Sequence, residues 1–114
     1  MATLNYNNRL EGYKGNSKSV LVIAYDPSNN LMDITNYDAF FYMKKYPVTA
    51  SSTLDVSVGH TSKDPSNGAF LFNLSSNTLD ISVGDYVYEV VIDDSSANRN
   101  TLIQDLFIIK ESLV

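Results

Sequence analysis

The chain has 114 residues, of which 44% are apolar, with a formal charge of −5 and no cysteine. This length allows one domain with a core of its own, and the lack of cysteine excludes disulfide bridges and thiolate metal sites. The acidic charge argues against nucleic acid and anionic membranes as partners, because both are negatively charged themselves.

The first half of the sequence predicts an arm followed by two strands. Residues 1–13 are polar and rich in asparagine, and we expect them to form either an edge strand or an extended arm. Ser19–Tyr25 is an apolar, β-branched run that ends at the turn residues Asp26-Pro27. Tyr37–Lys45 is the next strand, and Pro47 ends it because proline has no N–H to donate to an inner ladder.

The second half continues the pattern with almost no helical signal. Turn residues separate four further strand-like runs: Leu54–Val58, Phe70–Leu74, Tyr86–Ile92 and Thr101–Ile109. About seven strands at such spacing favour an all-β fold, a single immunoglobulin-like antiparallel β-sandwich that spans residues 1–114. A small barrel is the alternative. No apolar run approaches the length of a membrane helix, and no secretory signal is visible at the N-terminus.

Alternation along these strands assigns an inner and an outer face to each. On Tyr86–Ile92 the acidic Glu89 is predicted to point to solvent, which places every second residue from it on the outer face. The same reasoning applies to Tyr37–Lys45 and to the last strand. If the three strands share one sheet, its outer face is apolar and carries Phe40, Tyr42, Val87, Val91, Leu106 and Ile108.

These six residues form the predicted partner-binding site. A contiguous exposed apolar surface of several hundred Å² usually marks a contact site, because a free monomer seldom leaves such a surface in water. Two alternatives remain open. Either the arm at Leu4–Tyr13 or the segment 46–66 folds over this face within one chain, or one strand has a different register.

The sequence offers little for catalysis or for metal binding. His60 is the only histidine, and its place at the end of a strand is typical of a solvated loop residue. The pairs Asp26/Asp33 and Asp93/Asp94 are either calcium ligands or turn residues, and we expect turn residues because their spacing matches no calcium loop. We therefore predict no catalytic residue, no cofactor and no metal site.

Several segments follow one another in an order that is known from a protein family. Val20–Tyr25 is followed by Asp33-Ile34-Thr35, by Ala39–Lys44 with its basic end, and by Gly84-Asp85-Tyr86-Val87-Tyr88-Glu89. This order resembles the immunoglobulin-like domain of tailed-phage structural proteins, notably the N-terminal domain of siphophage baseplate upper proteins. The resemblance covers roughly residues 17–111. Two glycines of the family pattern are replaced here, by Asn36 and Asp105.

The resemblance implies an assembly module without catalytic residues. We therefore expect a non-enzymatic phage virion structural protein, a tail- or baseplate-associated adaptor or decoration protein, which acts through protein–protein contacts. A capsid decoration or cement protein is one alternative. The expected partners are other virion proteins, further copies of the same chain, or both, with neither nucleic acid nor a membrane. The expected location is the virion, assembled in the host cytoplasm.

Two other classes of function stay open as alternatives. The tyrosines Tyr6, Tyr13, Tyr42 and Tyr46 would suit a carbohydrate-binding module, since tyrosine rings stack on sugars, although tyrosine is also common in strands. A hydrolase that uses Asp and Glu side chains would require two carboxylates that meet in a cleft, and the sequence singles out no such pair.

Overall fold

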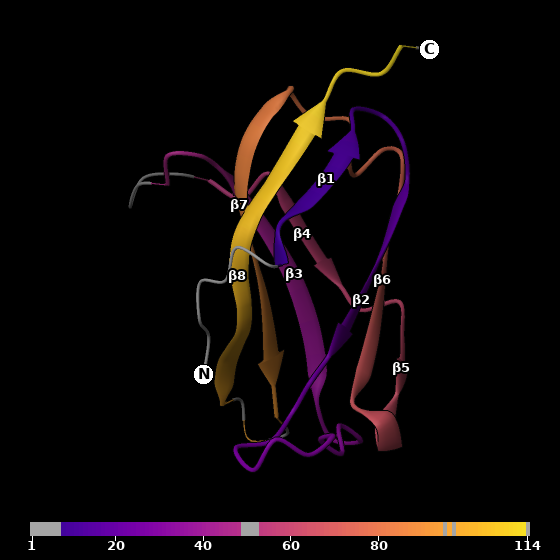
Figure 1. Ribbon diagram of the computed structural model, residues 1–114, viewed down its shortest axis with the longest axis vertical. Coiled ribbons are helices and arrows are strands. Elements are labelled where there is room, and N and C mark those ends of the chain that lie inside the picture. The colour runs from indigo at the N-terminus through magenta and orange to yellow at the C-terminus, as the bar shows by residue number, and fades with distance from the viewer. Residues whose placement is uncertain (1–7, 49–52, 95, 97, 114) are drawn as a thin grey trace.

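Alternating apolar residues build two β-sheets that pack face to face in the computed structural model, which describes residues 8–48, 53–94, 96 and 98–113 (Figure 1). The larger sheet has five strands, in the order β1 (Leu10–Tyr13), β8 (Arg99–Lys110), β7 (Gly84–Asp93), β3 (Asp38–Lys45) and β4 (Val56–Gly59). The smaller sheet has three strands, in the order β2 (Lys18–Ile23), β6 (Ala69–Leu74) and β5 (Ser62–Asp64). One short 3-10 turn, η2 (Pro65–Asn67), joins β5 to β6.

The predicted all-β sandwich is confirmed, with eight strands in the described residues where about seven were expected. The additional strand is β5, a polar segment of 3 residues that pairs with β6. All pairs are antiparallel except one, since β1 runs parallel to β8 at the edge of the larger sheet. Of the stretch predicted as an edge strand or arm, residues 10–13 form β1, and residues 1–7 lie outside the described part.

Aromatic rings from both sheets meet at the centre of the core. The ring of Phe41 on β3 stacks on Tyr88 of β7 with 5.3 Å between centroids, and it meets Phe107 of β8 edge-on at 6.2 Å. Phe72, on β6 of the smaller sheet, approaches the same ring at 5.7 Å and ties the two sheets together. Such pairs contribute about 0.5–1.5 kcal/mol each beyond the burial of their area.

The inner faces of the three central strands are the ones that alternation predicts. Each residue assigned to the core has an exposed fraction of 2% or less: Ala39, Phe41, Met43, Tyr86, Tyr88, Val90, Ile92, Phe107 and Ile109. Their register pairs across β3, β7 and β8 show that the three strands do share one sheet. No helix in the described ranges is long and apolar enough to cross a membrane.

A glycine and a lysine fix the lower end of the sandwich. Gly68 has a φ of +63°, and a Cβ atom at this position would lie 2.7 Å from the carbonyl oxygen of Ala24. Only glycine fits such a close approach, which explains the turn predicted at this point of the sequence.

From β5, the Lys63 ammonium donates to the carbonyl oxygens of Ile34 at 3.2 Å, Thr35 at 3.0 Å and Tyr37 at 2.7 Å. The long β2–β3 loop is thereby anchored to the smaller sheet.

Candidate functional site: a groove on the outer face of the larger sheet

The register of the larger sheet brings the six predicted contact residues to one face. Phe40 lies opposite Val91, and Val87 lies opposite Leu106, so that apolar side chains run across β3, β7 and β8. Tyr42 and Ile108 follow in the neighbouring rows, opposite Glu89 and Asp85, respectively. The predicted juxtaposition of Phe40, Tyr42, Val87, Val91, Leu106 and Ile108 is therefore present in the fold.

Their exposure differs from the expected open apolar surface. Val91 is buried, with 2% of its surface exposed, because Phe40 and Thr101 flank it on the neighbouring strands. The other five residues are half-buried. Val91 is thus not an exposed residue, although it contributes to one of the hollows described below. Tyr42, Val87 and Leu106 line these hollows as well, whereas Phe40 and Ile108 lie on the same face outside them.

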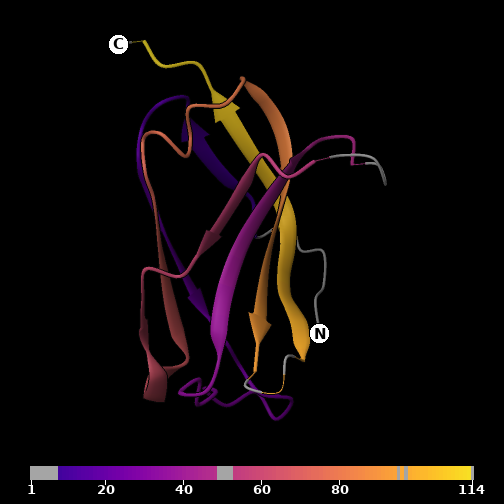
Figure 2. The same ribbon diagram turned by 180° about the vertical axis from the view of Figure 1, so that it is seen from behind.

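The cover comes from the connection between β3 and β4. Its described parts, residues 46–48 and 53–55, lie on the side of the larger sheet that faces away from the smaller sheet, as two opposite views show (Figures 1 and 2). Tyr46, Val48 and Leu54 line hollows together with residues of the sheet face. The alternative in which part of the segment 46–66 folds over this face therefore holds in part, while residues 49–52 lie outside the described part.

The covering residues are themselves apolar and exposed. Tyr46 is 56% exposed, Val48 is 45% exposed and Leu54 is 47% exposed. The connection therefore covers part of the sheet face and exposes apolar residues of its own. It replaces a flat apolar face with a groove that has an apolar wall and a mixed floor.

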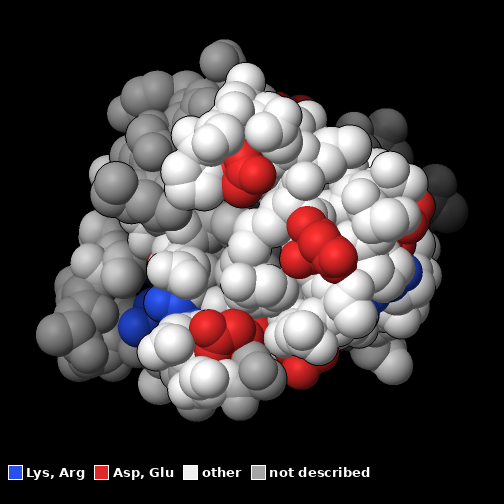
Figure 3. Space-filling view, turned by 90° about the horizontal axis from the view of Figure 1, so that it is seen from below, with Lys and Arg blue, Asp and Glu red and all other residues white. Residues whose placement is uncertain are grey.

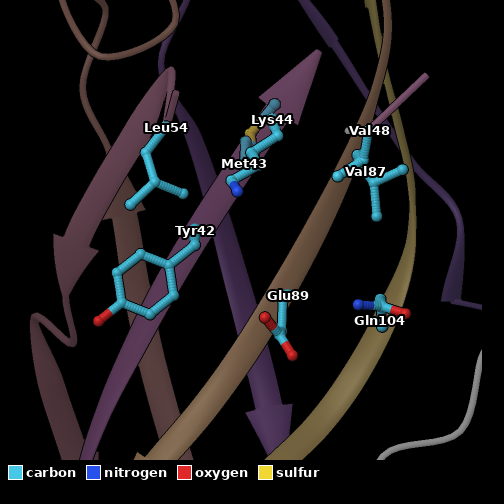
Figure 4. A pocket seen from close by; sticks show the side chains of 8 residues that line it. All are labelled: Tyr42, Met43, Lys44, Val48, Leu54, Val87, Glu89 and Gln104. Carbon is cyan, nitrogen blue, oxygen red and sulfur yellow. The ribbon is translucent and has the colours of Figure 1, made fainter. Parts of the chain in front are cut away.

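Three adjacent hollows make up this groove. The middle hollow has a volume of about 250 Å³ and lies between the wall and β3, β7 and β8 (Figure 4). Val48 and Val87 lie together at one end of it, Tyr42 and Leu54 lie at the other, and Glu89 lies between them. A second hollow of about 500 Å³ and a third of about 360 Å³ share residues with the middle one. The outer-face groove is lined by Tyr42, Met43, Lys44, Tyr46, Val48, Leu54, Asp85, Val87, Glu89, Val91, Arg99, Thr101, Gln104, Asp105 and Leu106.

Three polar side chains of the floor, those of Thr101, Glu89 and Arg99, have partners within the chain. The Thr101 hydroxyl donates to the Glu89 carboxylate at 2.6 Å. Arg99 donates two hydrogen bonds to Asp93, at 2.9 and 3.1 Å, and its guanidinium lies 5.9 Å from the ring centroid of Tyr42. These hydrogen bonds lower the pKa of Asp93 and raise that of Arg99 from their ordinary values. Arg99 and Asp93 neutralise each other, whereas Lys44, Asp85 and Glu89 form no ion pair with a described residue, so the floor is partly apolar and partly charged.

Two acidic residues of the groove, Asp85 and Glu89, are widely spaced along β7. Asp85 and Glu89 lie four residues apart on one extended strand, so their Cα atoms are separated by about 13 Å. Glycoside hydrolases place their two carboxyl groups about 5–9.5 Å apart.

The aspartates considered as calcium ligands cap their own loops. The Asp26 carboxylate accepts the backbone N–H groups of Ser28 at 2.9 Å and Asn30 at 3.0 Å. Asp33 and Asp94 accept hydrogen bonds from their own turns in the same way. Within the described ranges, no three His, Cys, Asp or Glu side chains gather in a group that could hold a metal ion.

His60 has a structural place that its sequence setting did not indicate. It was predicted to be a solvated loop residue, but it is half-buried, and its Nδ1 accepts the backbone N–H of Ala39 at 3.1 Å. Its ring packs on Phe70 with 5.5 Å between centroids. The imidazole thus links the end of β4 to β3 and to the core, and it has no free base to offer a substrate at Nδ1.

The wall of the groove is predicted only through the alternative in which the segment 46–66 folds over this face, without the residues that form it. The signal was present, because Tyr46, Val48 and Leu54 are apolar residues in a segment with serine, threonine and proline. Leu54 is predicted to begin a strand, but β4 begins at Val56, and alternation does not place the residues of a connection between strands.

Comparisons with known proteins support the fold. The structure is similar to the N-terminal domain of phage TP901-1 ORF48, with a TM-score of 0.61 and 15% sequence identity over 95% of this chain and 90% of that one. It is also similar to the soluble domain of PmoD from Methylocystis sp. ATCC 49242 (Rockwell), with a TM-score of 0.52 and 12% identity over 90% and 78% of the two chains. No protein-family model and no curated protein matches the sequence. The expected resemblance to a domain of a phage protein is confirmed at the level of the fold.

Proposed function

We propose that this chain is a non-enzymatic phage virion protein, a tail- or baseplate-associated adaptor or decoration protein that holds neighbouring proteins through its outer-face groove. A capsid decoration protein is the same proposal at another place in the particle. The groove is the observation that supports this proposal most directly, because its three hollows lie on the face that the strand pattern predicts as a contact surface. The fold shared with a domain of phage ORF48 supports the same assignment.

The properties of the groove suit a protein partner. Protein contact sites combine an apolar centre with a polar rim, and aromatic residues are enriched at their centres. Here Val48, Val87 and Leu106 supply the apolar centre, and Tyr42 and Tyr46 lie beside them. Burying such surface contributes on the order of 25 cal/mol per Å² before the costs of association are subtracted.

The proposal is tested in particles of the phage or prophage that encodes the chain. Particles purified on a density gradient are expected to contain the protein, detected by mass spectrometry of its peptides. The variant Val48→Asp places a charge on the wall of the groove, so it is expected to fold but to stay out of the particles. Thr53→Asp, at an exposed position one residue from Leu54, is the matched control and is expected to be incorporated. Particles without the wild-type protein would refute the proposal.

A glycan is the second candidate ligand, since Tyr42 and Tyr46 lie along the same groove as Glu89 and Gln104. Aromatic faces beside carboxylate and amide groups are typical of sugar-binding surfaces. A glycan array read at millimolar ligand concentration tests this candidate. Binding that is lost in Tyr46→Ala but kept in Tyr25→Ala, an exposed tyrosine elsewhere, would favour the glycan over the protein partner.

A further inference from the structure

Strand β2 is an open edge of the smaller sheet, and β6 binds it at alternate residues only. On β6, the carbonyl oxygen of Leu71 accepts the N–H of Thr61 at 2.7 Å, and the N–H of Asn73 donates to the Thr61 hydroxyl at 2.9 Å. Thr61 precedes β5, so these two groups point away from β2. Just beyond β2, by contrast, the N–H of Ala24 donates to the carbonyl oxygen of Gly68 at 2.8 Å. The even-numbered residues of β2 therefore bind β6, and the odd-numbered ones do not.

The odd-numbered residues direct their main-chain groups out of the side of the sheet. Leu71 and Asn73 lie opposite Leu21 and Ser19, and the alternation of an antiparallel ladder extends this pattern to Ile23. In the described part of the chain, no backbone group outside the β2–β6 pair binds the N–H and C=O groups of these three β2 residues. A row of free donors and acceptors along an extended strand is complementary to a second extended strand.

The other three sheet edges carry features that hinder the addition of a strand. β1 and β4 have 4 residues each, and Glu11 on β1 is charged and pairs with Lys110 at 2.9 Å. β5 has 3 residues, of which Lys63 and Asp64 are charged. β2 has 6 residues, and its charge is confined to the first of them, Lys18. Short strands and charged residues protect exposed edges in natural sheets, and β2 beyond Lys18 lacks both.

Apolar side chains line the same edge. Leu21 and Ile23 point to the outer face and are 63% and 37% exposed, while Val20 and Val22 point into the core. β-branched residues of this kind are typical of strands that are paired on both sides. A strand added at this edge gains contacts with Leu21 and Ile23 in addition to main-chain hydrogen bonds.

From these observations we infer that two copies of this chain associate through β2, in an antiparallel register about a two-fold axis at Leu21. Leu21 then lies opposite Leu21 of the second copy, and Ser19 lies opposite its Ile23. Every residue in these pairs has its main-chain groups on the open edge, so each pair exchanges two hydrogen bonds. The contact is isologous and closes at a dimer. This inference goes beyond the proposed function, because the contact leaves the outer-face groove free.

The charges at the two ends of β2 favour a second copy in this orientation. Lys18, at the start of β2, forms no ion pair with a described residue. The strand ends at the lower end of the sandwich, where acidic side chains outnumber basic ones (Figures 1 and 3). In the inferred register Lys18 lies opposite Ala24 of the second copy, two residues from its Asp26, so opposite charges approach each other. A parallel pair would instead place Lys18 beside Lys18.

Such a dimer joins the two smaller sheets into one continuous sheet. The two larger sheets then lie on the same side of this joined sheet, and their outer-face grooves point in the same direction. Two identical grooves on one side suit a protein that holds two neighbours in a symmetric particle.

The register is tested by disulfide trapping, since the chain has no cysteine of its own. Opposite hydrogen-bonded residues of an antiparallel pair have Cα atoms about 5.5 Å apart, which a disulfide can span. Leu21→Cys is therefore expected to form a disulfide dimer on mild oxidation. Ile23→Cys is the matched control and is expected to stay monomeric, because its two thiols would lie about 13 Å apart along the strands. A mixture of Ile23→Cys and Ser19→Cys is expected to form the mixed disulfide.

The mass in solution tests the contact without a cross-link. Light scattering coupled to size-exclusion chromatography and native mass spectrometry follow the mass up to about 1 mM protein, where even weak contacts are populated. The wild-type chain is expected to become a dimer. Leu21→Lys places two ammonium groups at the axis and is expected to be a monomer, whereas Ser66→Lys, at an exposed position outside β2, is expected to dimerise. Circular dichroism and a cooperative thermal transition establish that each variant is folded.

Three results would overturn the inference. They are a wild-type monomer at the highest concentration, a dimer that persists in Leu21→Lys, and equal trapping of Leu21→Cys and Ile23→Cys. Because the groove takes no part in the contact, each of these results leaves the proposed function standing.

Discussion

Tyr88 and Asp105 are register partners on β7 and β8, and together they bind both backbone groups of Asn8. The Asn8 N–H donates to the Asp105 carboxylate at 3.3 Å, and the Tyr88 hydroxyl donates to the Asn8 carbonyl oxygen. The other carboxylate oxygen of Asp105 accepts the N–H of Leu106 at 2.6 Å. Asp105 has no exposed surface, so this cluster fastens the start of β1 to the sheet through a buried charge.

Removal of the Asp105 side chain is expected to destabilise the fold. In Asp105→Ala, the N–H groups of Asn8 and Leu106 lose their acceptor, and buried groups without partners cost about 1–3 kcal/mol each. We expect the free energy of unfolding in urea to fall by about 2 kcal/mol or more. Asp105→Asn keeps one acceptor oxygen and is expected to lose less. An Asp105→Ala variant as stable as the wild type would contradict this role.

Ionisation of Tyr88 is expected to limit stability at alkaline pH. Burial raises the pKa of Tyr88 above its ordinary value, and the nearby charge of Asp105 adds to this effect. Since the unfolded chain releases this proton near pH 10 and the folded chain holds it, stability is full below pH 10 and falls as the pH rises above it. Denaturant titrations from neutral to alkaline pH measure this loss. Tyr88→Phe is expected to show a shallower loss than the wild type, whereas Tyr25→Phe, at an exposed position, is expected to follow the wild type.

Protonation of aspartates in the loops is expected to reduce the stability of the fold at low pH. Hydrogen bonds from Thr35 lower the pKa of Asp33, and backbone N–H groups of Asn98 and Ser96 lower that of Asp94. A carboxylate whose pKa is lower in the folded chain contributes stability above its unfolded pKa, near pH 4, and loses it as the pH falls through the folded value. The urea midpoint should therefore stay level above about pH 5 and decline below about pH 4. Asp33→Asn should lessen that decline, and a midpoint that rises on acidification would be inconsistent with these hydrogen bonds.

The ammonium group of Lys63 is expected to stabilise the folded chain through its hydrogen bonds. Lys63→Met keeps the aliphatic stem and removes the donor to the carbonyl oxygens of Ile34, Thr35 and Tyr37. Hydrogen bonds to a charged group contribute about 1.5–3 kcal/mol, so we expect thermal unfolding to shift down by several degrees. Lys44→Met is the matched control, because Lys44 forms no ion pair with the described residues, and its transition should stay near that of the wild type.

The sequence predicted the strands well where side chains alternate and less well where they do not. Because Glu89 is predicted to point to solvent, alternation assigns Tyr86 and Tyr88 of β7 to the core, and both are buried. The three-residue β5 escaped prediction because it is polar and lies where turn residues dominate. It exists because the β6 edge offers it a partner, which is a tertiary effect.

A bulge shows why the outer face could be predicted only in part. Val90 pairs with Ile103 and Val91 pairs with Thr101, so Leu102 is an extra residue in β8. Strict alternation from Ile108 would place Leu102 on the outer face, yet Thr101 lies there and donates to Glu89. Alternation from Phe107 and Ile109 places Asp105 on the inner face, but nothing in the local sequence indicates that the distant Asn8 supplies a donor to its carboxylate there.

The central claim is that the outer-face groove is covered by protein in the assembled particle. Because the chain has no cysteine, Val48→Cys introduces a unique thiol on the wall of the groove, and Ser76→Cys introduces one at an exposed control position. The measurement compares the rate of alkylation in the free protein with that in purified particles. The thiol at position 48 is predicted to react readily when free and to be strongly protected in particles, while the thiol at position 76 reacts alike in both. Equal reactivity at position 48 in free protein and particles would contradict the account.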